Sequence, residues 1–331
     1  MIKKPTVFIL GAGASIPYGY PSGETLVTET VSELLGKRML FQICRKMDFT
    51  ECEINEFANT LNRSGDKSID AFLERNSGFI KLGKVVITLK LIQKENEESL
   101  FSFHDDKWYG DVVNELKPSS VDSFDNNVSF LTFNYDRSFE HYLFLSIKNS
   151  YEEIKDVKQC AEIVSSIPII HLHGQIGKLP WQSNDGSGRQ YSESFEEIKY
   201  IRKTLSRNVE YLGSTLAKAR HYIVNISKQI KIIHEKELDS DDEFQKAKIL
   251  LNNAENIYFL GFGYHDVNLK RLNISQISPI SPKIKRNIDG TSYGIGAAKR
   301  KHINSVTNGR INLPEKNYKI IEFLKERVLF E

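Results

Sequence analysis

The sequence has few cysteines and no long hydrophobic run. It contains three cysteines, Cys44, Cys52 and Cys160, and no two of them have the C-x-x-C spacing of metal or redox sites. Three are too few for a disulfide framework, which favours a reducing compartment. No segment approaches the roughly 20 apolar residues of a membrane-spanning helix, and the N-terminal apolar run is too short for a signal peptide. We therefore expect an unprocessed, cytoplasmic protein that does not engage a membrane.

A strong charge of either sign is also missing. Lys and Arg total 45 against 43 Asp and Glu, so the formal net charge is +2 over 331 residues. This balance supplies no long-range field for a polyanion, and we expect no direct binding of nucleic acid. Hydrophobic residues make up 40% of the chain, which is enough for a substantial core. Internal repeats and convincing linkers are absent, which favours one composite domain over residues 1–331.

Four short apolar runs each lead into a polar or glycine-containing motif. They are TVFIL before GAGAS, VSFLTF before NYD, IPIIHL before HG, and NIYFL before GFGYHD. Buried parallel strands have this pattern when the loops at their carboxyl ends carry function. We expect an α/β fold with a Rossmann-like parallel sheet, at whose carboxyl edge the four motifs meet. Helical periodicity between the runs predicts large helical insertions at about residues 35–118 and 193–254.

The first motif predicts a phosphate-binding turn. Gly11 and Gly13 permit a tight turn, and the N–H groups of Ala14 and Ser15 are expected to be free to face a pyrophosphate. A full dinucleotide fingerprint has a third glycine where this chain has Ile16, which weakens a hydride-transfer function. A strand-to-helix turn that binds no ligand is the alternative.

Two loops are expected to be irregular or flexible. Residues 16–23 contain two prolines and two glycines, a composition that predicts a lid rather than a simple connector. NDGSGRQ, from Asn184 to Gln190, is expected to be a flexible loop.

Polar side chains follow the second and third runs. Asn134 and Asp136 alternate, so both leave the same edge of an extended segment; the amide can hold a hydroxyl or water, and the carboxylate can accept an amide N–H. A turn in which they satisfy their own backbone is the alternative. His171 and His173 lie on one face, where a histidine can act as a general base or can be a hydrogen-bonded core residue. A metal site is not expected, because no ligand set is complete.

The fourth motif and a later segment are less specific. Gly261 and Gly263 allow close backbone approach, and the polar residues behind them are possible ribose contacts or simply the start of a helix. These polar residues are His265, Asp266 and Asn268. IDGTSYGI, residues 288–295, is expected to form another turn.

In this order, GAGAS, TFNYD, HLHG and GFG resemble the sirtuin superfamily, in which NAD lies across a Rossmann-like core. The resemblance implies that Asn134 contacts the nicotinamide ribose and places the nucleophile, that Asp136 lies near the carboxamide, and that His173, directly before glycine, is the catalytic base. Phe133 stands where sirtuins have a glutamine. The implied NAD-binding residues are Gly11, Ala12, Gly13, Ala14, Ser15, Thr132, Gly261 and Gly263.

The chain also departs from protein-deacylating sirtuins. Their zinc ribbon of four cysteines follows the His-Gly motif, whereas this chain has no cysteine after Cys160, and Ser22 follows Pro21 where deacylases have Phe-Arg. The chain is similar instead to the sirtuin-like branch of bacterial antiphage defence proteins, as in Thoeris, defence-associated sirtuins and sirtuin–HerA systems. That branch also has an SIDxFL-like helix, which is Ser68 to Leu73 here.

This second resemblance implies an NAD hydrolase that forms nicotinamide and ADP-ribose without a metal. In that branch the enzyme depletes NAD in abortive infection, and by analogy we expect a homo-oligomer with a partner such as a HerA-type ATPase. The alternative is a non-catalytic NAD or ADP-ribose sensor that controls a partner ATPase or nuclease. An NAD-dependent protein deacylase ranks below both, and a dehydrogenase lower still.

Overall fold

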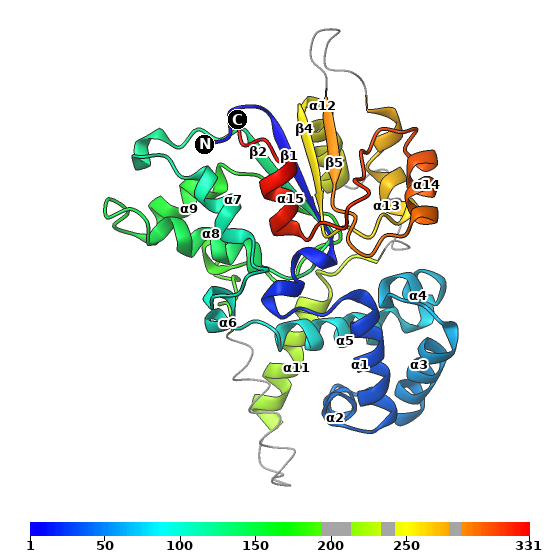
Figure 1. The fold of residues 1–331 in the computed structure, drawn as a ribbon. Helices are drawn as coiled ribbons and strands as arrows, with labels where there is room; N and C mark the ends of the chain where they lie inside the picture. The colour runs from blue at the N-terminus through cyan, green and yellow to red at the C-terminus, as the bar shows by residue number, and fades with distance from the viewer. Residues whose placement is uncertain (193–212, 233–241, 278–285) are drawn as a thin grey trace.

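A computed structural model describes residues 1–192, 213–232, 242–277 and 286–331. At its centre lies a five-stranded parallel sheet (Figure 1). The strands are β1 (Thr6–Leu10), β2 (Val128–Thr132), β3 (Ile169–His171), β4 (Asn256–Leu260) and β5 (Asn287–Gly290). All pairs are parallel and the order is β3-β2-β1-β4-β5. The expected α/β fold with a Rossmann-like sheet is confirmed.

β1 lies at the centre of the sheet, between β2 and β4. The chain builds one half of the sheet, β1 to β3, and then crosses back to add β4 on the other side of β1. Ligands of open α/β sheets bind at such a switch point, outside the carboxyl ends of the strands. The GAGAS turn after β1 and the GFG turn after β4 meet there.

β5 corrects one expectation. The stretch expected to form a turn, residues 288–295, begins inside this strand, where Ile288 pairs with Ile257 of β4, and the turn itself lies at Tyr293 and Gly294. The strand is short and polar, with the sequence NIDG, so it lacks the apolar run that marks the others. Pairing with β4 decides its structure.

Helices cover both faces of the sheet. One layer consists of α7 (Tyr109–Leu116), α8 (Ser138–Lys148), α9 (Val157–Ser165) and α15 (Ile320–Arg327). The other consists of α12 (Asp242–Asn253), α13 (Asp266–Arg271) and α14 (Ala297–Val306). Every residue of β1, β2 and β4 is buried, which explains why these strands are apolar on both faces.

A helical region lies beyond the carboxyl edge of the sheet (Figure 1). It contains α1 (Gly23–Leu35), α2 (Met39–Lys46), α3 (Glu51–Ser64), α4 (Ile69–Arg75), α5 (Ile80–Ile92) and α6 (Glu97–Phe101). α5 is apolar around most of its circumference and nearly all buried, because α1, α2, α4 and α11 (Gly213–Ser227) pack against it. The helices begin at Gly23, earlier than the expected residue 35.

Short 3₁₀ turns and undescribed segments complete the chain. The turns are η1 (Ala12–Ala14), η2 (Ile16–Tyr18), η3 (Ser77–Phe79), η4 (Val121–Ser123), η5 (Pro180–Gln182) and η7 (Ile274–Gln276). Residues 193–212 and 233–241 of the second expected insertion lie outside the described residues. In the described ranges, no helix combines the length and the apolarity that crossing a bilayer requires.

Candidate functional site

The glycine turns after β1 and β4 pack directly on each other. The N–H of Gly13 donates to the carbonyl of Gly261 at 2.9 Å. A Cβ on Gly11 or Gly13 would lie 2.6 or 2.8 Å from that same carbonyl oxygen, and one on Gly261 would lie 2.2 Å from the nitrogen of Ala14. Gly261 also has a φ of +57°, which disfavours a side chain. Backbone contact between the two turns therefore requires these three glycines, independently of any ligand.

The N–H groups of Ala14 and Ser15 in the first turn are not free, contrary to the expectation from the sequence. The N–H of Ala14 donates to the carbonyl of Gly11 at 2.9 Å, and that of Ser15 donates to Ala12 at 3.2 Å, because residues 12–14 form a 3₁₀ turn. A phosphate at this turn would have to share or replace those bonds. Pyrophosphate binding here stays a prediction.

Ser15 connects the first motif to the second. Its hydroxyl donates to Oδ2 of Asp136 at 2.7 Å and accepts from Nδ2 of Asn134 at 3.0 Å. The Asn134 amide also donates to the carbonyl of Gly11 at 2.9 Å. Both N–H donors of this amide are thus used within the protein. An added hydroxyl or water would therefore donate a hydrogen bond to Oδ1 of Asn134.

Asp136 is a buried carboxylate with several donors. The backbone N–H of Ser138 donates to its Oδ1 at 3.1 Å, the Ser138 hydroxyl makes a second, short bond, and Ser15 supplies a third. Burial raises the pKa of Asp136, while the hydrogen bonds from Ser138 and Ser15 oppose this rise. A carboxylate has about four acceptor positions, so about one is left for a ligand N–H.

His171 forms a buried pair behind the site. Its Nδ1 donates to the carbonyl of Asn134 and its Nε2 contacts Oε1 of Glu140, both at 2.8 Å. Burial by itself would lower the pKa of His171, but the Glu140 carboxylate and these bonds outweigh it and raise the pKa. Both ring nitrogens are occupied, so His171 positions the loop that carries Asn134.

His173 has the opposite surroundings. Its Nε2 accepts a hydrogen bond from the guanidinium of Arg271 at 3.2 Å, which requires a neutral ring with the proton on Nδ1. Burial lowers the pKa of His173 to about 3, and the positive charges of Arg271 and Lys231 contribute to this shift. The ring packs edge-on against Phe133, with 5.1 Å between centroids. His173 is therefore an unprotonated base whose acceptor nitrogen is occupied.

Gly174 fixes the backbone after His173. It has a φ of +75°, and an added Cβ would lie 1.9 Å from the carbonyl oxygen of Gln229. The N–H of Lys231 donates to the carbonyl of His173 at 2.9 Å. In the His-Gly motif, Gly174 thus allows the backbone to pass close to the segment that follows α11.

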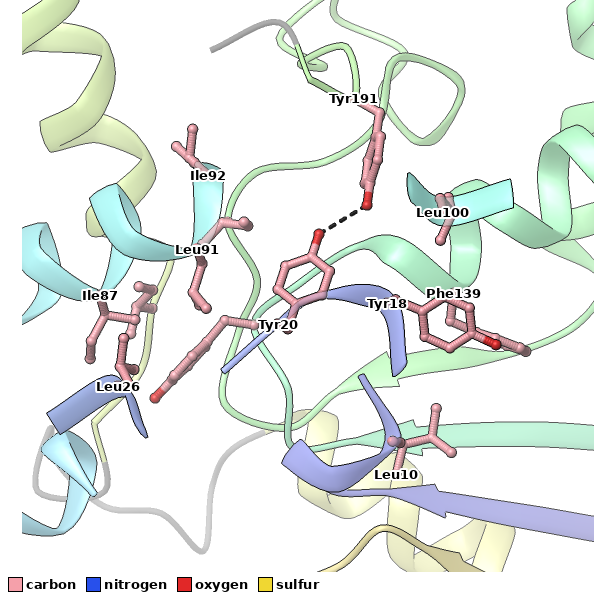
Figure 2. Close-up of a cluster of buried hydrophobic side chains, with 14 of the residues drawn as sticks. Leu10, Tyr18, Tyr20, Leu26, Ile87, Leu91, Ile92, Leu100, Phe139 and Tyr191 are labelled. Atoms are coloured by element: carbon pink, nitrogen blue, oxygen red, sulfur yellow. Dashed lines mark hydrogen bonds between the residues drawn. The ribbon is translucent and has the colours of Figure 1, made fainter. Parts of the chain in front are cut away.

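The expected lid is anchored at two tyrosines. The Tyr18 hydroxyl accepts from the backbone N–H groups of Trp108 and Tyr109, at 2.8 and 2.6 Å. The Tyr20 hydroxyl is 2.9 Å from that of Tyr191, and Figure 2 shows this bond between two distant segments. Both tyrosines are buried. Opening residues 16–23 as a lid would break these contacts.

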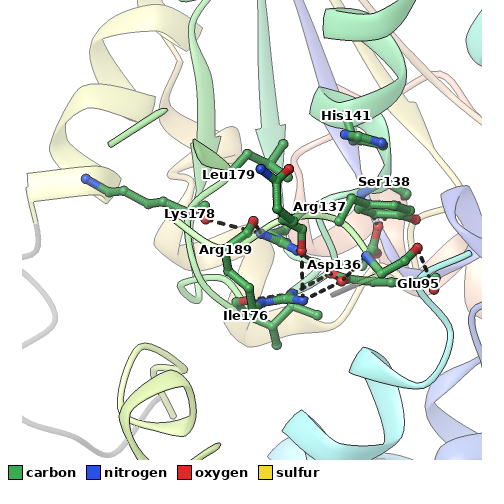
Figure 3. A network of polar contacts seen from close by, with 12 residues as sticks. Glu95, Asp136, Arg137, Ser138, His141, Ile176, Lys178, Leu179 and Arg189 are labelled. Carbon is green, nitrogen blue, oxygen red and sulfur yellow. Dashed lines mark hydrogen bonds and ion pairs between the residues drawn. The ribbon is translucent and has the colours of Figure 1, made fainter. Parts of the chain in front are cut away.

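A buried ion cluster that no sequence motif predicts is shown in Figure 3. Glu95 accepts from both Arg137 and Arg189, and all three side chains are at most 2% exposed. Arg189 lies near the carboxyl end of the loop from Asn184 to Gln190, which the sequence predicts to be flexible. The ion cluster ties this end of the loop to the core. No local signal reveals this cluster, because its members come from three distant segments.

The fourth motif divides into separate environments. Asp266 pairs with His302 at 2.9 Å on the exposed side of α13, and His265 occupies the residue before this helix. Oδ1 of Asn268 is buried and has no hydrogen-bond partner among the described residues. An added Cβ on Gly263 would approach only the His265 ring, at 3.2 Å. Of the expected ribose contacts, Asn268 alone has a polar atom that is buried without a hydrogen-bond partner among the described residues.

The structure brings most of the predicted residues to one edge of the sheet. Thr132 ends β2, and its hydroxyl accepts from the N–H of Asn134 at 3.0 Å. Over the described segments there is no group of three or more His, Cys, Asp or Glu residues able to hold a metal ion. Comparison with protein-family models and with the sequences of curated proteins finds no match to this chain.

Proposed function

We propose that the protein is an NAD hydrolase that produces nicotinamide and ADP-ribose. The observation that carries this proposal is the hydrogen-bonded group of Ser15, Asn134 and Asp136 at the carboxyl edge of a Rossmann-like sheet. A neutral His173 packs against Phe133, the residue before Asn134. The hydrogen bonds through Ser15 hold the amide and the carboxylate in fixed relation. The order of motifs that resembles sirtuins supplies the identity of the substrate.

The reaction needs positioning and one base. The glycosidic bond breaks with its electron pair on the nicotinamide nitrogen, which neutralises the pyridinium. Water attacks the oxocarbenium-like ribose carbon and its proton passes to Nε2 of His173. Oδ1 of Asn134 accepts from the water or a ribose hydroxyl, and Asp136 accepts from the carboxamide N–H. Release of the proton from His173 completes hydrolysis.

The same resemblance supports a biological role. As a sirtuin-like effector of antiphage defence, the protein would deplete NAD in an infected cell and would be restrained by assembly. A homo-oligomer, and a partner such as a HerA-type ATPase, would provide that restraint. A purified chain that is monomeric and fully active would contradict this part of the proposal.

The first experiment is chromatography of NAD incubated with the purified protein, with mass identification of products. Wild type should release nicotinamide and ADP-ribose, whereas Asn134→Ala should not. Asn149→Ala is the matched control, because among the described residues its exposed amide bonds only the carbonyl of Leu145, in the last turn of the preceding helix. Equal activity of Asn134→Ala and wild type would refute the assignment of Asn134.

The second candidate is a non-catalytic NAD or ADP-ribose sensor. It is favoured by the bond that occupies Nε2 of His173 and by the low pKa of that ring, since a base with a pKa of about 3 accepts protons weakly. Calorimetry with NAD separates the two candidates. Tight binding with intact nucleotide recovered, in the presence of the partner as well, would favour the sensor.

A further inference from the structure

Arg271 is the last residue of α13, and its side chain is held from two sides. One N–H of the guanidinium donates to Nε2 of His173 at 3.2 Å. Its central carbon lies 3.5 Å from the centroid of the Phe244 ring, a buried residue of α12. Stacking of this kind fixes the guanidinium plane while its edge remains the part that donates hydrogen bonds.

The charges around His173 are predominantly positive. The groups that face it are Arg271 from α13, Lys231 after α11 and the Tyr135 ring, with Glu243 of α12 paired to Lys231 at 2.7 Å. The neutral His173 ring accepts one hydrogen bond from Arg271, whereas a phosphate can bind a guanidinium through two parallel hydrogen bonds between charged groups. An anion that reaches Arg271 would therefore compete well with His173.

Asn268 adds an independent observation. It lies three residues before Arg271 on the same helix, so both side chains leave neighbouring positions of one face. Its Oδ1 is buried without a hydrogen-bond partner among the described residues. An unsatisfied buried acceptor is costly, and a ligand hydroxyl or N–H would satisfy it. This face of α13 thus offers a donor for an anion and an acceptor for a neighbouring polar group.

We propose that Arg271 is the phosphate-binding residue of this site and acts as a latch on His173. A phosphate of the dinucleotide binds the guanidinium edge, the bond to Nε2 breaks, and the freed nitrogen becomes available to take the proton from water. The proposal rests on the proposed NAD hydrolysis for that last step only. It identifies the substrate class as phosphorylated, so that nicotinamide riboside, which lacks phosphate, leaves the latch closed.

The binding part is tested by NMR without any turnover. His173, assigned by the loss of its signal in His173→Gln, is titrated in the full-length protein with and without inorganic pyrophosphate. Pyrophosphate should raise the pKa of His173 by about one pH unit or more, because a cation leaves and an anion arrives. The pyrophosphate effect should vanish in Arg271→Gln and persist in Lys270→Gln, which removes an exposed cation of the same helix.

The catalytic part uses substrate preference. Wild type should hydrolyse NAD at least about tenfold faster than nicotinamide riboside, and Arg271→Gln should reduce that ratio toward one; Arg271→Lys should fall between them. No pyrophosphate effect on His173 in wild type, or an equal effect in Arg271→Gln, overturns the latch. A pyrophosphate effect without any NAD hydrolysis, in the presence of the partner as well, overturns the hydrolase and leaves the latch standing.

Discussion

His171 and His173 are separated by one residue, yet their surroundings differ in every respect that governs a histidine. His171 contacts the carboxylate of Glu140 and a backbone carbonyl, which raise its pKa. His173 contacts the cation Arg271 and aromatic rings, which keep it neutral. The position of a histidine in the motif therefore does not determine its chemical role. The partners supplied by α8 and α13 decide which histidine supports the fold and which can accept a proton.

The largest expected effect is on stability, from His171→Ala. This change leaves the carboxylate of Glu140, whose side chain is 2% exposed, without its partner. Breaking a buried pair typically costs about 3–5 kcal/mol of unfolding free energy. Urea denaturation measures it. The double variant with Glu140→Gln should lose less than the sum of the two single changes, and strict additivity would show that the pair does not act as a unit.

The next effect is on activity, from His173→Ala. If His173 is the base of the proposed hydrolase, NAD consumption should fall about 100-fold or more, the usual contribution of a general base. The rate is followed by chromatography, and circular dichroism checks that the variant is folded. Unchanged NAD consumption in a folded His173→Ala protein would assign the base elsewhere.

The pH dependence of stability should separate the two histidines. His173 has a folded pKa of about 3 against about 6.5 when unfolded. Between these values the unfolded chain binds the extra proton, so stability falls with decreasing pH, by up to about 1.4 kcal/mol per pH unit. His171 behaves in reverse: its raised pKa contributes stability below pH 6.5 that is lost as pH rises through the folded value.

The measurement is urea denaturation from pH 4 to 8 for wild type, His171→Gln and His173→Gln. Titration of the carboxylates is common to all three proteins and largely cancels in the differences. His173→Gln should flatten the acidic side of the profile, and His171→Gln the alkaline side. Parallel profiles would contradict the opposite pKa shifts of the two histidines.

The smallest expected effect comes from Ser15→Ala. The change removes one donor to Asp136 and one acceptor of Asn134, while the two bonds from Ser138 remain, so a loss of about 1 kcal/mol is expected. Thermal denaturation measures this loss. Because Ser15 has no contact with either histidine among the described hydrogen bonds, the pKa values of His171 and His173 should not change in NMR titrations. A shift in either value would show that the two halves of the site are coupled.

Local patterns were sufficient for the strands and insufficient for the loops. The apolar runs that became β1 to β4 carry their own signal, because a strand buried on both faces needs a continuous hydrophobic segment. The short polar β5 carries no such signal. The loop that ends near Arg189 shows the same limit: its glycines predict flexibility, but Glu95 and Arg137 hold it through contacts that no spacing reveals.

The sequence by itself determined the class of fold, the edge of the sheet where the motifs meet and the residues gathered there, because continuous apolar runs mark the buried strands and the polar motifs follow directly at their carboxyl ends. Only the tertiary structure decided what each residue does at that edge. Gly11 and Gly13 serve the packing of Gly261, and Arg271 closes on His173, through contacts between segments far apart in the chain. The physical reason is that hydrogen bonding and charge depend on distances in space, which residue spacing along the chain does not contain.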